Sequence, residues 1–348
     1  MTPRWWAAAS AVGALVLTLL LAGLSLAVGG YDPIEAFGAL LRGALGSPSA
    51  VLSITLVRTV PLLLTGLAVA LAFRAGVWNI GAEGQLYAGA VAAVWVGLQV
   101  AALPAWAAGS AVLLGAAIAG AAWAAVPALM KLRLGVGEVI TTLLLNFVAI
   151  ELSAWMVHGP LQEPRGVFPQ TEAIADVARL PIVVAGTRLH LGFVIAVGVA
   201  LLLAAALRWT RVGFFVRAVG ASNGAARVSG RVPVARVVLG VFLLSGALAG
   251  LAGGVEVSGV TFVLYEDLSP GHGYTAIAVA LLAGLHPVGV VGTAVLFGVL
   301  EGGASAMQRD AGVPAAWVDA VQALVILSVL VMDRVARRGL ERWREGRG

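Results

Sequence analysis

The stretch AGVWNIGAEGQLYAGA, Ala75 to Ala90, lies where one long apolar run ends and the next begins. Its polar side chains are Asn79, Glu83 and Gln85, and they alternate with the glycines Gly76, Gly81 and Gly84. Glycines at this density break a regular helix and let neighbouring backbones approach closely. The stretch therefore predicts an irregular connection followed by a helix with polar residues in its first turn.

The runs on both sides of this stretch are too apolar for a soluble protein. Among the 348 residues, 60% are hydrophobic and 11% are charged, and the mean hydropathy is +0.99. A soluble domain carries about a quarter charged residues. Crossing ~30 Å of hydrocarbon takes roughly 20 apolar residues, and the chain has many runs of that kind. The composition predicts an all-α, polytopic membrane helix bundle.

In a membrane protein, a polar segment with irregular backbone cannot face the lipid, because its backbone groups would lack hydrogen-bond partners there. Non-helical backbone at membrane depth is tolerated only where it is buried in protein or lines a cavity. We therefore predict that Asn79, Glu83 and Gln85 line or shape a translocation pathway. The alternative is an ordinary cytoplasmic turn in which Asn79 caps the following helix.

Apolar runs bounded by charges or by Pro and Gly predict ten spans. They cover residues 5–28, 52–73, 82–102, 105–130, 138–157, 189–207, 236–256, 273–285, 288–307 and 316–333. The run from Trp5 to Val28 exceeds the apolar core of a signal peptide, so we expect an uncleaved span. We expect one transmembrane domain over 1–348, with 5–28 as an extra first span, 52–157 as a first half, 208–236 as a cytoplasmic loop and 236–333 as a second half.

The basic residues favour both termini in the cytoplasm. With that orientation, the inside holds Arg4, Arg74, Lys131, Arg133 and the arginines from Arg208 to Arg236 and from Arg334 to Arg347. The outside holds fewer, namely Arg42, Arg58, Arg165, Arg179, Arg188 and Arg309. The net charge of +5 is explained by this topology and does not indicate nucleic-acid binding.

A faint internal similarity suggests an inverted repeat. Leu63-Leu64-Thr65-Gly66 aligns with Leu243-Leu244-Ser245-Gly246, and the two spans run in opposite directions in the ten-span topology. Inverted repeats are common in transporters whose site lies near the midplane. Chance similarity between helices rich in Leu, Ala and Gly is the alternative.

The span over 138–157 carries a polar stripe. Glu138, Thr142, Asn146 and Ser153 fall within about 80° of one another on a helical wheel. Such a stripe should face the bundle interior, where a solute or another helix satisfies it. We count Glu138, Thr142 and Asn146 as pathway candidates, with interhelical hydrogen bonding as the alternative.

The cytoplasmic loop from Arg208 to Arg236 predicts a short helix. Ser222 or Asn223 is a plausible N-cap, Gly230 a stop and Pro233 a breaker, which leaves about two turns. So short a helix is unstable alone and must dock on something. The residues alone leave a partner protein and anionic lipid equally open.

The segment from His158 to His190 is long for a connector and carries four prolines, Pro160, Pro164, Pro169 and Pro181. It lies outside in the predicted topology, where a protein that delivers the solute could dock. A passive loop is the alternative.

Other chemistry is not indicated. The single lysine, Lys131, precedes Leu132, so the phosphate-binding loop of an ATPase is absent from the chain. There are no cysteines, and the four histidines show no spacing typical of metal ligands. The sequence therefore predicts no catalytic residue, no metal and no cofactor, and any ATP-driven motor must be another polypeptide.

The chain resembles the permease subunits of bacterial ABC importers for branched-chain amino acids, simple sugars and nucleosides. The resemblance covers nearly the whole chain and is most specific at RAGVWNIGAEGQLYAGA, LGVGEVITTLLLNFVA, VGASNGAARVSG and GYTAIAVALLAGLHPVGVV. With its extra first span and YDPIEAFGALLRGALGSP, the chain is most similar to the longer of two nucleoside-type permeases.

This resemblance implies a type II importer fold and a nucleoside as the solute. It also implies a second permease chain, cytoplasmic ATPase subunits, an external substrate-binding lipoprotein and a place in the cell inner membrane. The implied coupling helix comprises Ala221, Ser222, Asn223, Gly224, Ala225, Ala226, Arg227, Val228 and Ser229. Alternatives are a simple sugar or branched-chain amino acid as solute, an ATP-independent secondary transporter or channel, or an intramembrane enzyme.

Overall fold

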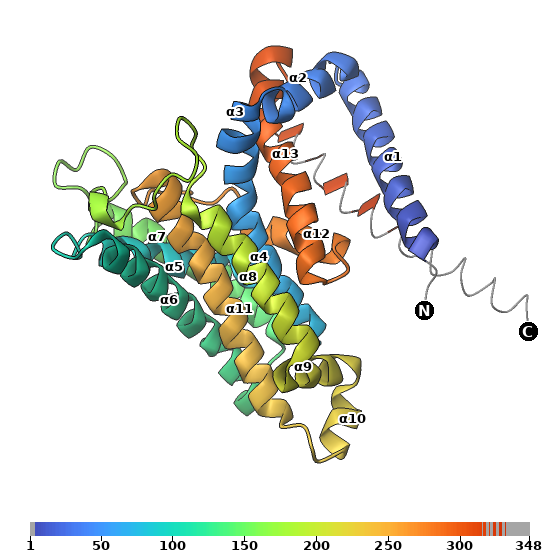
Figure 1. Ribbon diagram of the computed structural model, residues 1–348, viewed down its shortest axis with the longest axis vertical. Helices are drawn as coiled ribbons and strands as arrows, with labels where there is room; N and C mark the ends of the chain where they lie inside the picture. Colours follow the sequence, from blue (N-terminus) through green and yellow to red (C-terminus); the bar gives the residue numbers. More distant parts are fainter. Residues whose placement is uncertain are drawn as a thin grey trace, which may run out of the picture. The chain divides into compact units, whose positions relative to one another are not determined.

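The computed structural model describes residues 4–314 and, beyond them, 316, 317, 320, 323, 324, 327, 328 and 331. In this part of the chain the regular elements are helices, joined by turns and by two isolated β-bridges (Figure 1). The all-α prediction is confirmed. The predicted tenth span, 316–333, lies largely outside the described residues, as do the arginines from Arg334 to Arg347.

The α-helices follow one another along the chain, and the longest connection between them is the segment that joins α7 to α8. They are α1 (Arg4–Val28), α2 (Pro33–Leu45), α3 (Pro48–Ala50), α4 (Leu56–Arg74), α5 (Ala82–Gly97), α6 (Ala105–Leu134), α7 (Glu138–His158), α8 (Leu191–Trp209), α9 (Arg211–Ala221), α10 (Asn223–Val228), α11 (Val234–Glu256), α12 (His272–Leu282) and α13 (Pro287–Ala311). Two π-helical turns, Val51–Thr55 and Val257–Thr261, extend α4 and α11, and a 3₁₀ turn covers Asp176–Ala178.

Six helical segments among the described residues are long and apolar enough to cross a membrane. They are Pro48–Arg74, Ala105–Leu134, Glu138–His158, Leu191–Trp209, Val234–Thr261 and Pro287–Ala311. Helix α1 has 25 residues, whereas α5 and α12 have 16 and 11 and are shorter than a full span. The count of ten spans therefore stays a prediction.

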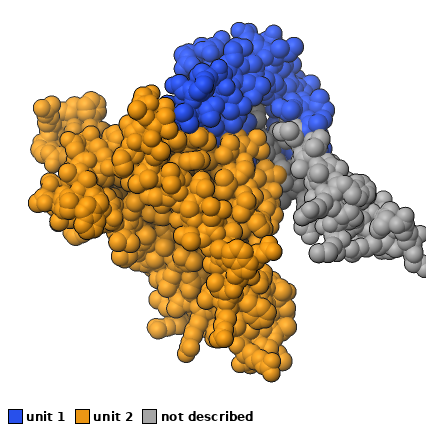
Figure 2. Space-filling model, in the orientation of Figure 1, with its two compact units in different colours: residues 1–55, 297–348 blue, residues 56–296 orange. Residues whose placement is uncertain are grey.

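The chain divides into two compact units, residues 1–55 with 297–348 and residues 56–296 (Figure 2). In the first unit, α1, α2 and the end of α13 share an apolar cluster that contains Leu26, Leu40 and Met307. Asp32 caps α2 because its Oδ1 accepts the Ile34 amide at 2.8 Å.

Helices α4 and α11 form the centre of the second unit. Helix α4 is buried along nearly its whole length, and α11 lies beside α6 through facing glycines (Figure 1). A Cβ on Gly250 would lie 2.8 Å from Gly120 Cα, and a Cβ on Gly120 would lie 2.6 Å from Gly250 Cα. Small residues allow such close backbone packing between membrane helices, where dispersion and weak hydrogen bonds replace the hydrophobic effect.

Candidate functional site

The predicted break between α4 and α5 is present at residues 75–81, which form a turn followed by irregular, non-helical chain. Gly76 turns the chain at φ +71°, a left-handed conformation that favours glycine. Helix α5 begins after Gly81, which makes no side-chain capping bond. The N-cap of α5 is therefore Gly81 and not Asn79, although the buried Asn79 side chain accepts the Gly81 amide at 3.0 Å through Oδ1.

Asn79 and Gln85 form a closed amide pair across the break. Asn79 Nδ2 donates to Gln85 Oε1, and Gln85 Nε2 donates to Asn79 Oδ1, each at 3.1 Å. Asn79 Nδ2 also donates to Ser245 Oγ at 2.9 Å, and that hydroxyl donates to the Ala68 carbonyl at 2.9 Å. The pair thus connects the break to both central helices, α4 and α11.

The polar stripe on α7 supplies the second set of contacts. Asn146 accepts the Gly84 amide at 2.9 Å through Oδ1 and donates to the Ile80 carbonyl at 2.9 Å through Nδ2. Thr142 Oγ1 accepts the Ile80 amide at 3.2 Å. The prediction that this stripe faces the interior is confirmed, and in this conformation another segment of the chain satisfies it.

The stripe is polar at both ends. Glu138 is partly exposed, forms an ion pair with Lys131 and accepts the Trp78 amide at 3.5 Å. At the other end Ser153 is buried, and its hydroxyl has no hydrogen-bond partner among the described residues.

Two short helices meet at Glu83. Its carboxylate, in the first turn of α5, accepts the Gly273 amide in the first turn of α12 at 2.5 Å. Each helix N-terminus carries a partial positive charge, so one buried carboxylate stabilises both. Ser269 adds to the junction, because its backbone amide donates to the Tyr87 hydroxyl at 3.2 Å and its Oγ accepts the His272 amide.

Sequence reasoning missed the α12 side of this junction. Ser269, His272 and Gly273 are buried and lie close to α5 in space, but they follow Glu83 by almost two hundred residues. The available signal was the pattern SPGHGY, in which glycines flank the start of a short apolar helix as they do near Glu83.

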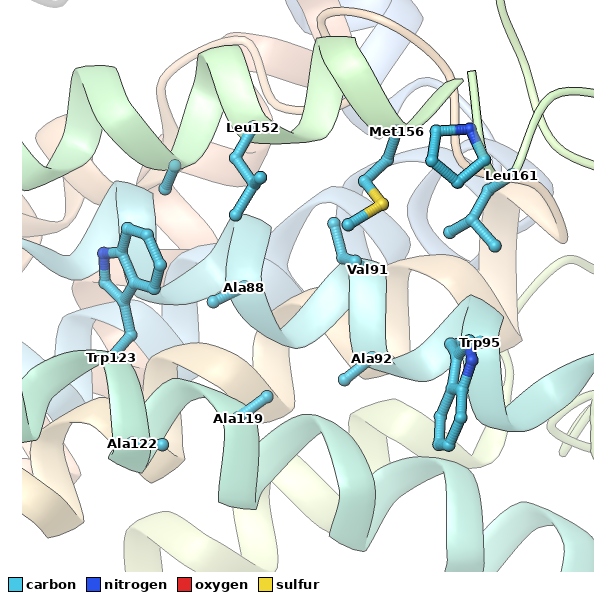
Figure 3. Close-up of a pocket in the computed structure, with 12 residues that line it drawn as sticks. Ala88, Val91, Ala92, Trp95, Ala119, Ala122, Trp123, Leu152, Met156 and Leu161 are labelled. Carbon is cyan, nitrogen blue, oxygen red and sulfur yellow. The ribbon is translucent and has the colours of Figure 1, made fainter. Parts of the chain in front are cut away.

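An apolar cavity of about 710 Å³ is lined by residues of α5, α6 and α7 and by the start of the segment after α7. Figure 3 shows Leu152 and Met156 pointing into it from α7 and Trp123 from α6. The indole Nε1 of Trp123 is buried and has no hydrogen-bond partner within the described part of the chain. Such a lining suits hydrocarbon, because a polar solute would lose its hydrogen bonds with water and gain few in return.

The predicted short helix in the 208–236 loop is α10. Ser222 caps it, with Oγ accepting the Ala225 amide at 3.2 Å, and Gly230 follows it at φ +64°. Ala226 is buried against the chain itself, whereas Ala225 and Val228 are exposed, Val228 at 89%. Because these two residues lie one turn apart, they share an outward face.

The segment from His158 to His190 is anchored to the connection before α12. The Thr171 amide donates to the Leu264 carbonyl and the Ile174 amide to the Phe262 carbonyl, both at 2.9 Å. His190 caps α8, and burial, together with the nearby Arg188, lowers its pKa to about 4. Val167, Phe168 and Ile182 stay exposed on this anchored segment.

Comparisons with known proteins match this architecture. Residues 51–330 match the family described as branched-chain amino acid transport system, permease component. A glucose ABC transporter permease protein of Haloferax volcanii is 40% identical over 95% of this chain and 89% of its own. A guanosine ABC transporter permease protein of Bacillus subtilis is 36% identical over 94% of this chain and 96% of its own. A nucleoside ABC transporter permease protein of Lactococcus lactis is 32% identical over 91% of this chain and 89% of its own. No match to a solved structure was found.

Proposed function

The chain belongs to the family of branched-chain amino acid transport system permease components, and from this we propose that it passes a nucleoside from an external binding protein into the cytoplasm. As an ABC transporter permease it is a multi-pass membrane protein and not itself an enzyme. The observation that carries the proposal is the family match over residues 51–330. The sequence also lacks the phosphate-binding loop of an ATPase, which agrees with a permease role.

The solute is inferred from the relatives. Two of them, at 36% and 32% identity, are named for guanosine or nucleosides, which supports a nucleoside. The relative at 40% identity is named for glucose, so a simple sugar is the second candidate. Uptake by the transporter reconstituted with its binding protein tests both. Labelled guanosine and labelled glucose are measured separately, each with the other, unlabelled solute as competitor. Uptake of glucose that guanosine does not reduce would contradict the nucleoside proposal.

We further propose that the polar cluster shapes the pathway by holding the α4–α5 break in place. Its members are Asn79, Glu83, Gln85, Glu138, Thr142 and Asn146. The amides and hydroxyls of this set form hydrogen bonds with one another or with the α4–α5 break. These bonds support a role in which the side chains line the pathway and exchange partners during alternating access. A solute can replace such bonds one for one, because amides and hydroxyls both donate and accept.

Replacing Asn79 or Gln85 with leucine is expected to lower uptake about tenfold or more. Asn79→Leu removes both bonds from the buried Gln85 amide, and Gln85→Leu removes one partner from Asn79, which keeps its bond to Ser245. A buried donor or acceptor that loses its partner costs about 1 to 3 kcal/mol. Uptake, membrane insertion and ATPase co-purification are measured together. Gln99→Leu, at an exposed glutamine just beyond α5, is the matched control. Normal uptake by both core variants would make the segment an ordinary turn.

The proposed orientation places both termini and the 208–236 loop in the cytoplasm. Because the chain has no cysteine, Ser222→Cys and Ala185→Cys each introduce one thiol, and both positions are exposed. A membrane-impermeant maleimide added to intact cells is expected to label Ala185→Cys only. Labelling of Ser222→Cys from outside would contradict the orientation.

The proposed partners dock at opposite ends of the chain. We place the ATPase at α10, on the face formed by Ala225 and Val228. We place the substrate-binding lipoprotein at the anchored outer segment, where exposed Val167, Phe168 and Ile182 support a protein contact. A second, different permease chain completes the pathway in this proposal.

A further inference from the structure

A small basic pocket lies at the ends of α4 and α8, beside α9. Its volume is about 270 Å³, and it is lined by Arg74, Ala204, Leu207, Arg208, Arg217, His286 and Pro287. Three separate helices contribute one arginine each, and Arg74 and Arg217 are close enough for their charges to repel each other. None of the polar cluster residues takes part in it.

These arginines have no acidic partner in the part of the chain that the structure describes. Among the described residues, Arg74, Arg208 and Arg217 form no salt bridge, and Arg74 Nη1 donates to the Leu285 carbonyl at 3.1 Å. The sequence contains no Asp or Glu between Asp176 and Glu256, the stretch that supplies Arg208 and Arg217. Each guanidinium has five N–H donors, so most donors remain available to a ligand. Gathering like charges without counter-charge is unfavourable, and an anion would relieve it.

The surroundings of the pocket fit a membrane interface. Trp209, Val212 and Phe214 belong to the same stretch of chain as Arg208 and Arg217, and they are 78%, 68% and 56% exposed. Trp is enriched at membrane–water interfaces, and a helix that carries apolar and basic residues together lies in the interface plane. Ala204 and Leu207 form an apolar wall beside the arginines, next to which an acyl chain can lie.

We propose that Arg74, Arg208 and Arg217 bind the phosphate group of an anionic phospholipid. The guanidiniums supply charge-assisted hydrogen bonds to phosphate oxygens, and the apolar side chains around them contact the glycerol and acyl portion. The site is separate from the solute pathway and from α10. Because Arg208 and Arg217 belong to the 208–236 loop, a bound lipid would fix the position of the part of that loop that leads to α10.

The test is lipid binding to the full-length chain in neutral detergent, followed by native mass spectrometry. Short-chain phosphatidylglycerol and phosphatidylcholine with identical acyl chains are titrated separately. We expect wild type to prefer phosphatidylglycerol, and Arg217→Gln to reduce that preference on the order of fivefold. Added salt should weaken the preference in wild type, because part of it is electrostatic.

Arg211→Gln is the matched control, since it removes the same charge from the same helix at an exposed position outside the pocket. It is expected to keep the wild-type preference. Thermal unfolding without lipid checks that both variants fold alike, and Arg208→Gln replaces Arg217→Gln if the latter is unstable. Equal loss in Arg211→Gln, or no loss in either pocket variant, overturns the proposal. If inorganic phosphate competes fully with phosphatidylglycerol, the pocket binds free phosphate and the proposed lipid ligand is wrong.

Discussion

Gly273→Ala is expected to abolish uptake and to lower the thermal stability of the chain, although it adds only one methyl group. A Cβ at position 273 would lie 2.5 Å from Glu83 Cα and 2.7 Å from Ala82 C. Both are backbone atoms, so no rotamer change relieves the overlap. Helix α12 must move away from α5, and the Gly273 amide then loses the Glu83 carboxylate.

The cost of that movement has two parts. Overpacking of a tight contact costs about 1 to 3 kcal/mol, and a buried carboxylate deprived of a donor adds several more. Thermal unfolding in detergent and uptake by the assembled transporter are the measurements.

Gly240→Ala is the matched control for this prediction. It adds the same methyl group to a helical glycine that has open space around its Cβ position. We expect wild-type behaviour or slight stabilisation, because alanine favours helix over glycine by about 1 kcal/mol. If Gly273→Ala has the same stability and uptake as Gly240→Ala, the α5–α12 junction is not important for the structure.

Ala225→Glu is expected to abolish coupling to the ATPase without harming α10. Glutamate at this position is the third helical residue after the Ser222 cap, which completes a capping box and favours the helix. The side chain points outward with Val228, so the new charge enters the proposed contact surface. An unpaired charge buried there costs several kcal/mol.

The expected phenotype is normal membrane insertion with loss of the ATPase on purification, or ATP hydrolysis that no longer drives uptake. Ala226→Glu should behave differently, because Ala226 is buried in the chain itself and its replacement destabilises the loop. Arg227→Gln and Arg231→Gln test docking on anionic lipid, and they should matter little if α10 binds a protein. Full uptake and ATPase binding by Ala225→Glu would make the assignment of α10 wrong.

Local features of this protein followed from the sequence alone. The membrane class follows from composition, the break at 75–81 from dense glycines, and the limits of α10 from Ser222 and Gly230. The inward face of the α7 stripe followed from spacing on one helix. Each of these depends on residues within a few turns of one another, where backbone preferences and hydrophobicity act directly.

Long-range contacts needed the tertiary structure. Glu83 with Gly273, Asn79 with Ser245, and the three arginines of the basic pocket join segments far apart in the chain. The outward direction of Ala225 and the inward direction of Ala226 were also undetermined, since both are small residues in a short loop helix. Apolar helices rich in Leu, Ala and Gly resemble one another, so only the packing of their surfaces decides which polar groups come within hydrogen-bonding distance.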